Sequence, residues 1–412
     1  MSLIRPFRGL RPAPGHAAAV AAPPYDVLSS EEARARAAGR PDSFLHISKA
    51  EIDLPEGTDI YSSAVYAKAA ENLARMVAAG TLRRDASATF YAYRLTMGDH
   101  VQTGLVAAAS VADYDTNRIR KHEFTRPDKE DDRVRQIEAL SAQTGPVLLA
   151  YRADAAVDAL IAGIAQGDAD SDVTADDGIR HQVWRLADDQ RVAALVRAFD
   201  AMPALYIADG HHRSAAASRV AAARRQPGRT LSSDAFLAVI FPHTQMKIMD
   251  YNRVVRDLNG LTPVTFLARC SESFDVTPSE ARVTPAQAGE FGMYLGGHPR
   301  GHWYRLRLRA GLASDDPVAG LDVSLLSDHL LGPVLGITDL RRDKRIDFVG
   351  GIRGLAELER RVDSGEMAVA FALHPTGMEQ LMAVADNNQV MPPKSTWFEP
   401  KLADGLVSLV LD

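Results

Sequence analysis

The stretch PALYIADGHHRSAAASRVAAARR, residues 203–225, decides the fold of this chain. Its first residues, PALYIA, are short and apolar, which predicts a buried strand. The strand ends abruptly at DGHHR (209–213), and the Ala-rich run after it predicts a helix that extends to about Arg225. The stretch therefore predicts a strand joined to a helix by a very tight turn, which is a building unit of mixed α/β structure.

The DGHHR turn also has the chemistry of an anion site. Gly210 permits a tight turn or the close approach of a ligand to the backbone. Because the helix begins at once, its free N–H groups and the positive end of its dipole face whatever lies at the end of the strand. Arg213 falls in the first helical turn and can bind two phosphate oxygens, while His211 and His212 add hydrogen-bond donors. We interpret the turn as a phosphate site.

Two other interpretations of this turn stay open. Asp209 can simply cap the helix, with the two histidines as polar surface residues. Asp209 and His211 can instead supply two metal ligands, but that site needs a further carboxylate from elsewhere, so no metal site is predicted. The turn matches neither a P-loop nor the Gly-rich dinucleotide-binding fingerprint.

The same alternation of strands and helices continues along the chain. Before residue 245, strands are predicted at 88–95, 101–111, 146–151 and 235–241, and helices at about 30–39, 58–79, 154–165 and 188–199. Beyond it, helices are predicted at 263–274, 322–335, 353–364 and 376–385, a hairpin at 291–309, and strands at 367–373 and 405–411. This order predicts an α+β (mixed α/β) fold, with an N-terminal α/β domain (1–245) and a C-terminal α/β region (246–412) that can be interleaved with it.

A dense mixed-charge segment, RKHEFTRPDKEDDR (120–133), is the second candidate site. Thr125 is predicted to cap a helix that has a proline in its first turn. Arg126 and Arg133 are seven residues apart, so they would share one helix face, as a clamp for a polyanion requires. The alternative is a solvated helix of mixed charge, which is the usual role of such a segment.

The residues just before that helix favour a functional role. Lys121, His122 and Glu123 follow a predicted strand and place an acid–base pair near the positive end of the helix dipole.

A third polar motif lies near the C-terminus, where a diproline stiffens the loop ahead of Lys394, Ser395 and Thr396. Those three side chains suit a phosphate or carboxylate, although an exposed loop anchored by its aromatics explains them equally well.

Composition bounds the class of protein. The chain has 412 residues, with 47 Lys+Arg against 53 Asp+Glu and a formal net charge of −6, so it does not have the charge of a general nucleic-acid binder. Its single cysteine, Cys270, excludes an internal disulfide and lies in a predicted helix among apolar residues, which indicates a core position. No apolar run is long enough to span a bilayer, and no secretory signal is evident, so a cytoplasmic protein is predicted.

Five motifs in chain order resemble one family. They are RPFRGLRP (5–12), APPYDV (22–27), RKHEFTRPDKEDDR (120–133), YIADGHHR (206–213) and MPPKSTWFEPKL (391–402). Together they resemble the bacterial and archaeal family known as domain of unknown function 1015, and the resemblance spans nearly the whole chain. The family name itself implies no activity, although an association with serine and phosphoserine metabolism goes with it.

The ADGHHR turn alone is similar to the phosphate-binding turn of the ParB/sulfiredoxin-like superfamily. This resemblance implies a ParB/sulfiredoxin-like core, with helices around mixed sheets, that is extended by the C-terminal half. The superfamily includes a nucleotide-dependent kinase for free serine, nucleotide-hydrolysing partition proteins and sulfiredoxin. Sulfiredoxin needs a reactive cysteine where this chain has His211, and the acidic balance does not favour a DNA-binding partition protein. The resemblance therefore implies the free serine kinase branch.

These features predict a small-molecule phosphotransferase, a kinase or a phosphatase, that acts on a hydroxylated metabolite such as serine or phosphoserine with nucleotide phosphate (ATP or ADP). The candidate catalytic residues are Glu123, Asp209 and His212. The candidate phosphate- or substrate-binding residues are Lys121, His122, Arg126, Arg133, Gly210, His211, Arg213, Lys394, Ser395 and Thr396. In this scheme Glu123 or Asp209 is the general base.

Mg²⁺ is expected if a nucleotide is used, although the sequence shows no dedicated ligand set. The expected partner is a small phosphorylated molecule, with neither nucleic acid nor membrane, and a homodimer is left open. The alternative function is a non-catalytic sensor that binds a nucleotide or a phosphorylated metabolite. In a sensor, Arg213 and the two histidines of the turn would bind phosphate, but no general base would lie next to the bound phosphate.

Overall fold

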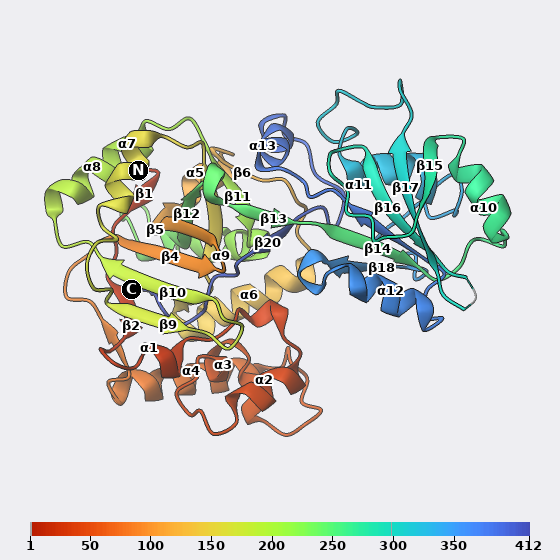
Figure 1. Ribbon diagram of the computed structural model, residues 1–412. Helices are drawn as coiled ribbons and strands as arrows, with labels where there is room; N and C mark the ends of the chain where they lie inside the picture. The colour runs from red at the N-terminus through yellow and green to blue at the C-terminus, as the bar shows by residue number, and fades with distance from the viewer. Residues whose placement is uncertain (1, 298) are drawn as a thin grey trace. The chain divides into compact units, whose positions relative to one another are not determined.

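The computed structural model describes residues 2–297 and 299–412. The chain divides into two compact units, which are described separately here: unit 1 contains the residues up to Met246 together with Pro400–Asp412, and unit 2 contains Lys247–Glu399. Both units combine helices with mixed or antiparallel sheets (Figure 1). The predicted α+β fold class is therefore confirmed.

Unit 1 is built on a nine-stranded mixed sheet. Its strands, in order across the sheet, are β6 (Ile119–Arg120), β11 (Leu205–Asp209), β8 (Val147–Tyr151), β12 (Ala235–Pro242), β5 (His100–Ser110), β4 (Tyr91–Met97), β10 (Arg180–Arg185) and β9 (Ser171–Thr174), with β1 (Ile4–Arg5) paired to β5. The pairs β6–β11 and β8–β12 are parallel, and the other pairs are antiparallel. The predicted hairpin is formed by β4 and β5.

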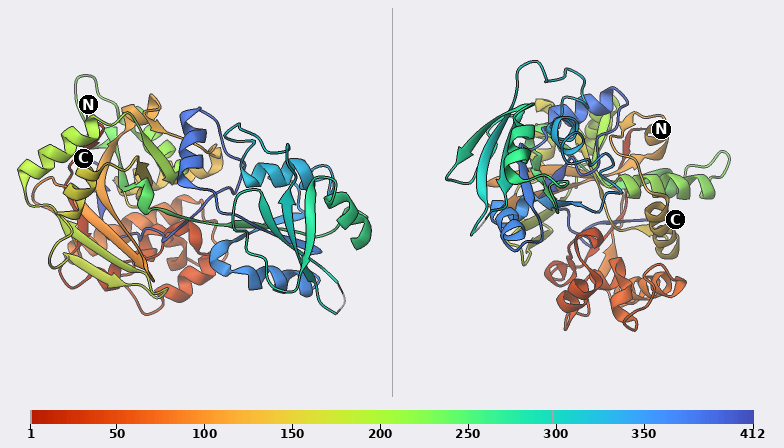
Figure 2. Two further views of the ribbon diagram at one scale, coloured as in Figure 1. Left: turned by 45° about the horizontal axis from the view of Figure 1, so that its top comes forward. Right: turned by 90° about the vertical axis from the view of Figure 1, so that its right-hand side faces the viewer.

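Helices and a small second sheet surround this sheet. The helices of unit 1 are α1 (Ala17–Val20), α2 (Ser30–Ala37), α3 (Leu45–Ser48), α4 (Ser63–Ala78), α5 (Val111–Asp115), α6 (Pro127–Leu140), α7 (Ala155–Ala162), α8 (Asp189–Asp200) and α9 (His211–Arg224). The second sheet has the order β3 (Leu82–Arg84), β2 (Gly9–Pro12), β21 (Ser408–Val410) and β7 (Ala142–Gln143). The pairing of β21 with β2 and β7 places both ends of the chain in unit 1 (Figure 2).

The core of unit 1 lies on the large sheet. All eight residues of β12, from the apolar run AFLAVIF that predicted it, are buried between β8 and β5. Ala216 and Ala217 of α9 are also buried, because their small side chains let the helix lie close to the strands. A second apolar cluster joins α2, α3 and α4, which are grouped together in Figure 1.

One helix boundary in unit 1 differs from the prediction. The helix predicted at 58–79 begins only at Ser63, after Ser62 as N-cap. The preceding residues form turns instead, with Thr58 N–H bonded to Pro55 O (3.1 Å) and Ser62 N–H bonded to Asp59 O (2.9 Å). Local turn bonds of this kind compete with helix formation.

Unit 2 is built on a six-stranded antiparallel sheet. The strand order is β15 (Phe274–Ser279), β17 (His302–Leu308), β16 (Glu290–Leu295), β19 (Val369–Leu373), β14 (Tyr251–Val255) and β18 (Ile346–Gly350), and a separate pair is formed by β13 (Lys247–Met249) and β20 (Trp397–Glu399). The helices are α10 (Pro263–Cys270), α11 (Asp322–Leu326), α12 (Leu355–Asp363) and α13 (Met378–Asp386). The predicted hairpin is formed by β16 and β17, and its predicted turn includes His298, which lies outside the described residues.

Two predicted helices of unit 2 are shorter than expected. The helix at 263–274 ends at Cys270, because Phe274 already begins β15. The helix at 322–335 is α-helical only to Leu326 and continues as a wider π-helical turn over Ser327–Leu331. Cys270 is fully buried, and burial raises the pKa of its thiol to about 12, which fits the predicted core role. Within the described ranges, no helix is long and apolar enough to cross a membrane.

Candidate functional site

The DGHHR turn has the local structure that its sequence predicts. Strand β11 ends at Asp209, Gly210 is the N-cap with φ of 99°, and α9 begins at His211. The backbone angle favours glycine here, and a Cβ on residue 210 would also lie 2.8 Å from Nε of Arg213, so that side chain would have to shift. Arg213 therefore lies in the first turn of α9, folded back over the end of the strand.

Parallel pairing of β6 with β11 brings the second motif to this turn. Ile119 is opposite Leu205, so the residues after β6 run beside the end of β11. There His122 donates its backbone N–H to Nε2 of His211 (3.4 Å), and the two rings meet edge to face with centroids 4.5 Å apart. Nδ1 of His211 lies 3.7 Å from Oε2 of Glu123. The structure thus brings His122, Glu123 and His211 together.

The two central histidines are buried and neutral. Burial lowers the pKa of His122 to about 4. Burial, together with the neighbouring His122, holds the pKa of His211 well below its usual value. Nδ1 of His122 has no hydrogen-bond partner among the described residues. Neither ring carries a positive charge at neutral pH, so the charge of the cluster comes from other side chains.

Asp209 lies between two cations. Its Oδ2 is 3.5 Å from Nζ of Lys401 and 3.6 Å from Nη2 of Arg213. Burial acts to raise the pKa of Asp209, but Lys401 and Arg213 outweigh it and hold that pKa well below the usual value. Asp209 is therefore a permanently charged anchor for Arg213. Sequence reasoning assigned Lys401 no role, although it lies in the fifth family motif, MPPKSTWFEPKL (391–402).

His212 has a different role from the one predicted. Its Nε2 accepts the backbone N–H of Arg126 at 3.1 Å, which ties the start of α9 to the start of α6. Because the ring nitrogen is occupied by a backbone donor, His212 positions the loop rather than presenting a free base. The N-cap of α6 is Arg126 and not Thr125, since the Thr125 hydroxyl donates to the Glu130 side chain instead.

Arg126 and Arg133 lie in unlike environments and do not form the predicted clamp. The Arg126 side chain is 69% exposed and its Nη2 is paired with Asp128 at 2.7 Å. The Arg133 side chain is only 13% exposed, is paired with Asp132 at 2.7 Å, and stacks over the Tyr25 ring at 3.9 Å from the ring centroid. Of these two arginines, only Arg133 is buried inside unit 1.

The Lys121 side chain contacts Tyr114. Its ammonium donates to Tyr114 O at 3.1 Å and lies 4.0 Å from the centroid of the Tyr114 ring. Burial lowers the pKa of Lys121. The predicted role of Lys121 in neutralising a transferring phosphate remains a prediction.

A small cavity lies beside the first turn of α9. Its volume is about 30 Å³, and it is lined by Tyr25, Ser48, Arg133, Gln136, Ile137, Ala142, Gln143, Thr144, Gly145, Arg213 and Asp404. Two buried guanidiniums, those of Arg133 and Arg213, therefore share one space. That volume accommodates about two water molecules, so the cavity suits one small polar arm of a ligand.

The cavity wall contains residues that sequence reasoning did not assign. Tyr25 comes from the APPYDV motif, which by itself indicates only a rigid turn, and burial raises its pKa to about 12. Asp404 comes from the C-terminal segment and is 2% exposed. Burial raises the pKa of Asp404 to about 7, although Arg213 opposes that rise. A signal for Tyr25 was available in its family motif; none was available for Asp404.

The remaining predicted residues lie in unit 2. Lys394 has φ of 59°, and its Nζ lies 5.6 Å from the centroid of the Tyr251 ring. Ser395 is buried and its hydroxyl donates to Pro392 O at 2.6 Å. Thr396 is half-buried beside it. Their expected role in closing the site of unit 1 remains a prediction.

Metal ligands are not grouped in the described ranges. Among those residues, no set of three or more His, Cys, Asp and Glu side chains is arranged to hold a metal ion. The Asp209 carboxylate, which could bind Mg²⁺, already faces two cations. A magnesium ion would therefore have to be held largely by nucleotide phosphates.

Comparisons with known proteins give one firm result. No curated protein matches the chain. Among solved structures, a free serine kinase in complex with AMP is 14% identical, with 72% of this chain and 86% of that chain covered and a TM-score of 0.36. A conserved hypothetical protein from Pyrococcus furiosus is 14% identical, with 74% of this chain and 94% of that chain covered and a TM-score of 0.36. SbnI from Staphylococcus aureus, with a C-terminal truncation, is 12% identical, with 74% of this chain and 87% of that chain covered and a TM-score of 0.38.

Structural likenesses of that size do not assign an activity to this chain. The family comparison is stronger, because the model of the family described as "Protein of unknown function (DUF1015)" matches residues 4–324. That range includes the DGHHR turn, His122 and the buried Arg133 and Arg213, and it is more than half of the chain. The chain belongs to the DUF1015 family.

Proposed function

We propose that this chain is a small-molecule phosphotransferase that binds nucleotide phosphate (ATP or ADP) and acts on a hydroxylated metabolite such as serine or phosphoserine. The observation that carries the proposal is the convergence of Arg133 and Arg213 on one cavity beside the N-terminal turn of α9. Guanidiniums and helix N-termini both bind phosphate oxygens, and burial makes their attraction stronger than it is in water. The acceptor is the one that the resemblance of the DGHHR turn implies.

The residues divide the work between binding and positioning. Arg213 binds phosphate oxygens with its planar fork, and Asp209 holds that fork in place together with Lys401. The neutral rings of His122 and His211 pack at the start of α9 without adding charge, and they help to hold the DGHHR turn in place. Such positioning and electrostatic stabilisation are the main sources of catalysis in phosphoryl transfer.

The size of the cavity limits what enters it. About 30 Å³ does not hold a nucleotide, so the adenosine part must lie outside, along the surface of unit 1. The cavity itself can hold either a terminal phosphate oxygen or the hydroxyl arm of the acceptor. Magnesium, if used, would arrive with the nucleotide and shield its phosphate charge.

The test combines binding with turnover. Thermal shift with ATP, ADP, serine, phosphoserine and inorganic phosphate should show stabilisation by the phosphorylated ligands, because a ligand that binds only the folded chain raises its stability. Turnover of ATP should depend on the acceptor and fall at least about tenfold in Arg213→Lys, which keeps the charge but loses the fork.

Arg219→Gln is the matched control. Arg219 lies on the same helix, but it is 45% exposed and paired with Asp131 at 2.7 Å. It should leave turnover unchanged. Ligand stabilisation without any turnover would instead support the phosphate sensor, and the absence of stabilisation by every phosphorylated ligand would contradict the phosphate site itself.

A further inference from the structure

Asp404 is a buried carboxyl group held in the cavity wall by backbone pairing. Its N–H donates to Ala22 O at 2.9 Å, and Ala22 N–H donates to Asp404 O at 3.2 Å. This bridge fixes the C-terminal segment beside the turn Tyr25–Val27, which follows Ala22 and the diproline. The side chain is thereby directed to the space that Arg133 and Arg213 also line.

The groups around Asp404 act on it in opposite directions. The charged and titratable side chains that act on it are Arg213 of α9, Arg133 of α6, Asp26 of the turn and Tyr93 of β4, and the backbone N–H of Tyr25 also donates a hydrogen bond to its carboxyl group. Burial raises the pKa of Asp404 to about 7, Asp26 adds to the rise, and the two arginines oppose it. A carboxyl group with a pKa near 7 can take up or release a proton near neutral pH.

One oxygen of the Asp404 carboxyl group is buried and, among the described residues, unpaired. Oδ1 of Asp404 has no hydrogen-bond partner in the described part of the chain. A Cβ on Gly145 would lie 3.6 Å from that oxygen and 3.3 Å from Cδ of Arg213, so the missing side chain keeps the space between the two groups open. A buried unpaired carboxylate oxygen is costly, and here it lies where a small polar group of a ligand could bind.

We propose that Asp404 is the catalytic base of the site and binds the acceptor hydroxyl in the cavity. This inference rests on the proposed function. The hydroxyl oxygen attacks the terminal phosphorus of the nucleotide and forms the new P–O bond. The bond from that phosphorus to the bridging oxygen breaks, and its electron pair leaves with the shortened nucleotide, which is ADP when the donor is ATP and AMP when it is ADP. The hydroxyl proton passes to Oδ1 of Asp404.

The two carboxylates predicted for this role are less well suited. Asp209 is held charged by Lys401 and Arg213, and a carboxylate stabilised in that way is a weak base. Glu123 is half exposed, faces His211, and is not part of the cavity wall. Asp404 alone shares the cavity with both phosphate-binding arginines.

Calorimetric titration with sulfate tests this role without any assumed substrate. Sulfate keeps its charge from about pH 5 to about pH 9, and the histidines at the turn stay neutral over most of that range because their pKa values are lowered. Ionised Asp404 repels an anion, so sulfate affinity should fall as the pH rises through about 7. In Asp404→Asn the affinity should be higher at alkaline pH and nearly independent of pH.

The unmodified protein provides a second readout. Sulfate binding at about pH 7 should take up roughly half a proton, seen as a dependence of the binding heat on the buffer. Turnover should show the opposite trend to binding, because a base works only when ionised: kcat/KM, which reports the free enzyme, should rise through about pH 7. Asp404→Asn should lower kcat by roughly 10²–10⁴-fold, while the nucleotide KM stays the same or falls, because the variant no longer repels the anion.

Asp176→Asn, a matched change at an exposed aspartate, should leave every readout unchanged. The outcomes separate the two proposals. Failure of sulfate and nucleotides to bind at any pH would contradict the phosphate site. Sulfate binding that takes up no proton, or that depends on pH equally in Asp404→Asn, would overturn the role of Asp404 and leave the phosphate site standing.

Discussion

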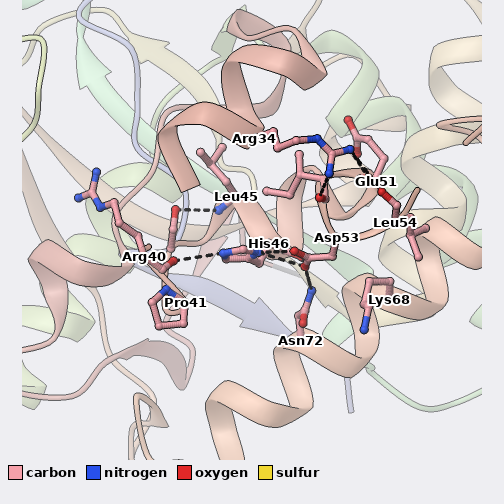
Figure 3. Close-up of polar contacts among 12 residues, drawn as sticks. Arg34, Arg40, Pro41, Leu45, His46, Glu51, Asp53, Leu54, Lys68 and Asn72 are labelled. Carbon is pink, nitrogen blue, oxygen red and sulfur yellow. Dashed lines mark hydrogen bonds and ion pairs between the residues drawn. The ribbon is translucent and has the colours of Figure 1, made fainter. Parts of the chain in front are cut away.

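Unit 1 contains two clusters in which histidine meets aspartate, and they differ in how fully their polar atoms are paired. In the first (Figure 3), Nδ1 of His46 bonds to Asp53 at 2.8 Å and Nε2 bonds to Arg40 O at 3.1 Å. Asn72 donates to His46 O and to Asp53, both at 2.7 Å. Each ring nitrogen of His46 has a partner, and the network ties α3 to α4.

The second cluster is the one at the DGHHR turn. There Nδ1 of His122 and Oδ1 of Asp404 have no partner among the described residues, and Asp404 and Arg213 line one cavity. Residue types alone do not distinguish the clusters, since both combine His, Asp and Arg. Complete pairing indicates a structural network, whereas unpaired buried atoms around a cavity indicate a place for a ligand.

The largest expected difference between the clusters is in acid stability. His122 is neutral in the folded chain, with its pKa lowered by burial to about 4 from an ordinary value near 6.5. Above about pH 6.5 neither state is protonated; as the pH falls further, the unfolded chain takes up the proton and the folded chain does not. Stability is therefore lost between about pH 6.5 and 4, by about 3 kcal/mol for this group.

Urea unfolding across that range measures the effect, and His211 should add to it in the same direction. His122→Gln should flatten the acid limb of the stability profile. An acid limb of the same steepness in His122→Gln would show that His122 is not held neutral in the folded chain.

The next effect is on anion binding. Arg213→Lys should weaken phosphate binding by roughly tenfold to a hundredfold, since a hydrogen bond to a charged group contributes about 1.5–3 kcal/mol. Titration calorimetry with inorganic phosphate measures the loss. Equal affinities in the variant and the unmodified protein would place the anion elsewhere.

The structural cluster should respond in the opposite manner. Asp53→Asn keeps the shape of the side chain but loses the charged acceptor of His46 and Asn72, at a cost of about 1–2 kcal/mol of unfolding free energy. Phosphate affinity should not change. A change in phosphate affinity in Asp53→Asn would contradict a purely structural role for the His46–Asp53 cluster.

The smallest effect is expected on the surface of α9. Arg219→Gln removes exposed ion pairs with Glu130 and Asp131, so stability should change by no more than about 0.5 kcal/mol. Thermal unfolding checks this, and a larger loss would mean that contacts between α6 and α9 depend on their surface charges.

Local sequence predicted the turn because its causes are local. An apolar strand, a glycine that can adopt positive φ and an Ala-rich helix fix β11, Gly210 and α9 with no help from distant residues. The same holds for the apolar strand β12 and the hairpin of β4 and β5. The α+β class follows from such elements.

The site could be predicted only in part because burial is decided at long range. Arg126 and Arg133 come from one charged segment, yet only Arg133 is covered, by Tyr25 from far earlier in the chain. Lys401 and Asp404 reach unit 1 when the chain returns from unit 2. Lys401 lies in the last family motif, but no local pattern predicts that either side chain packs near the DGHHR turn. The helix cap of α6 was misplaced for a related reason, since His212 holds the Arg126 backbone.

A crystal structure of the full chain grown with inorganic phosphate would locate the anion site itself. A phosphate should lie within hydrogen-bond distance of the Arg133 and Arg213 guanidiniums, with Asp404 facing it across the space that Gly145 leaves open. A phosphate bound only at exposed arginines such as Arg126, with the cavity closed by its own side chains, would contradict that placement.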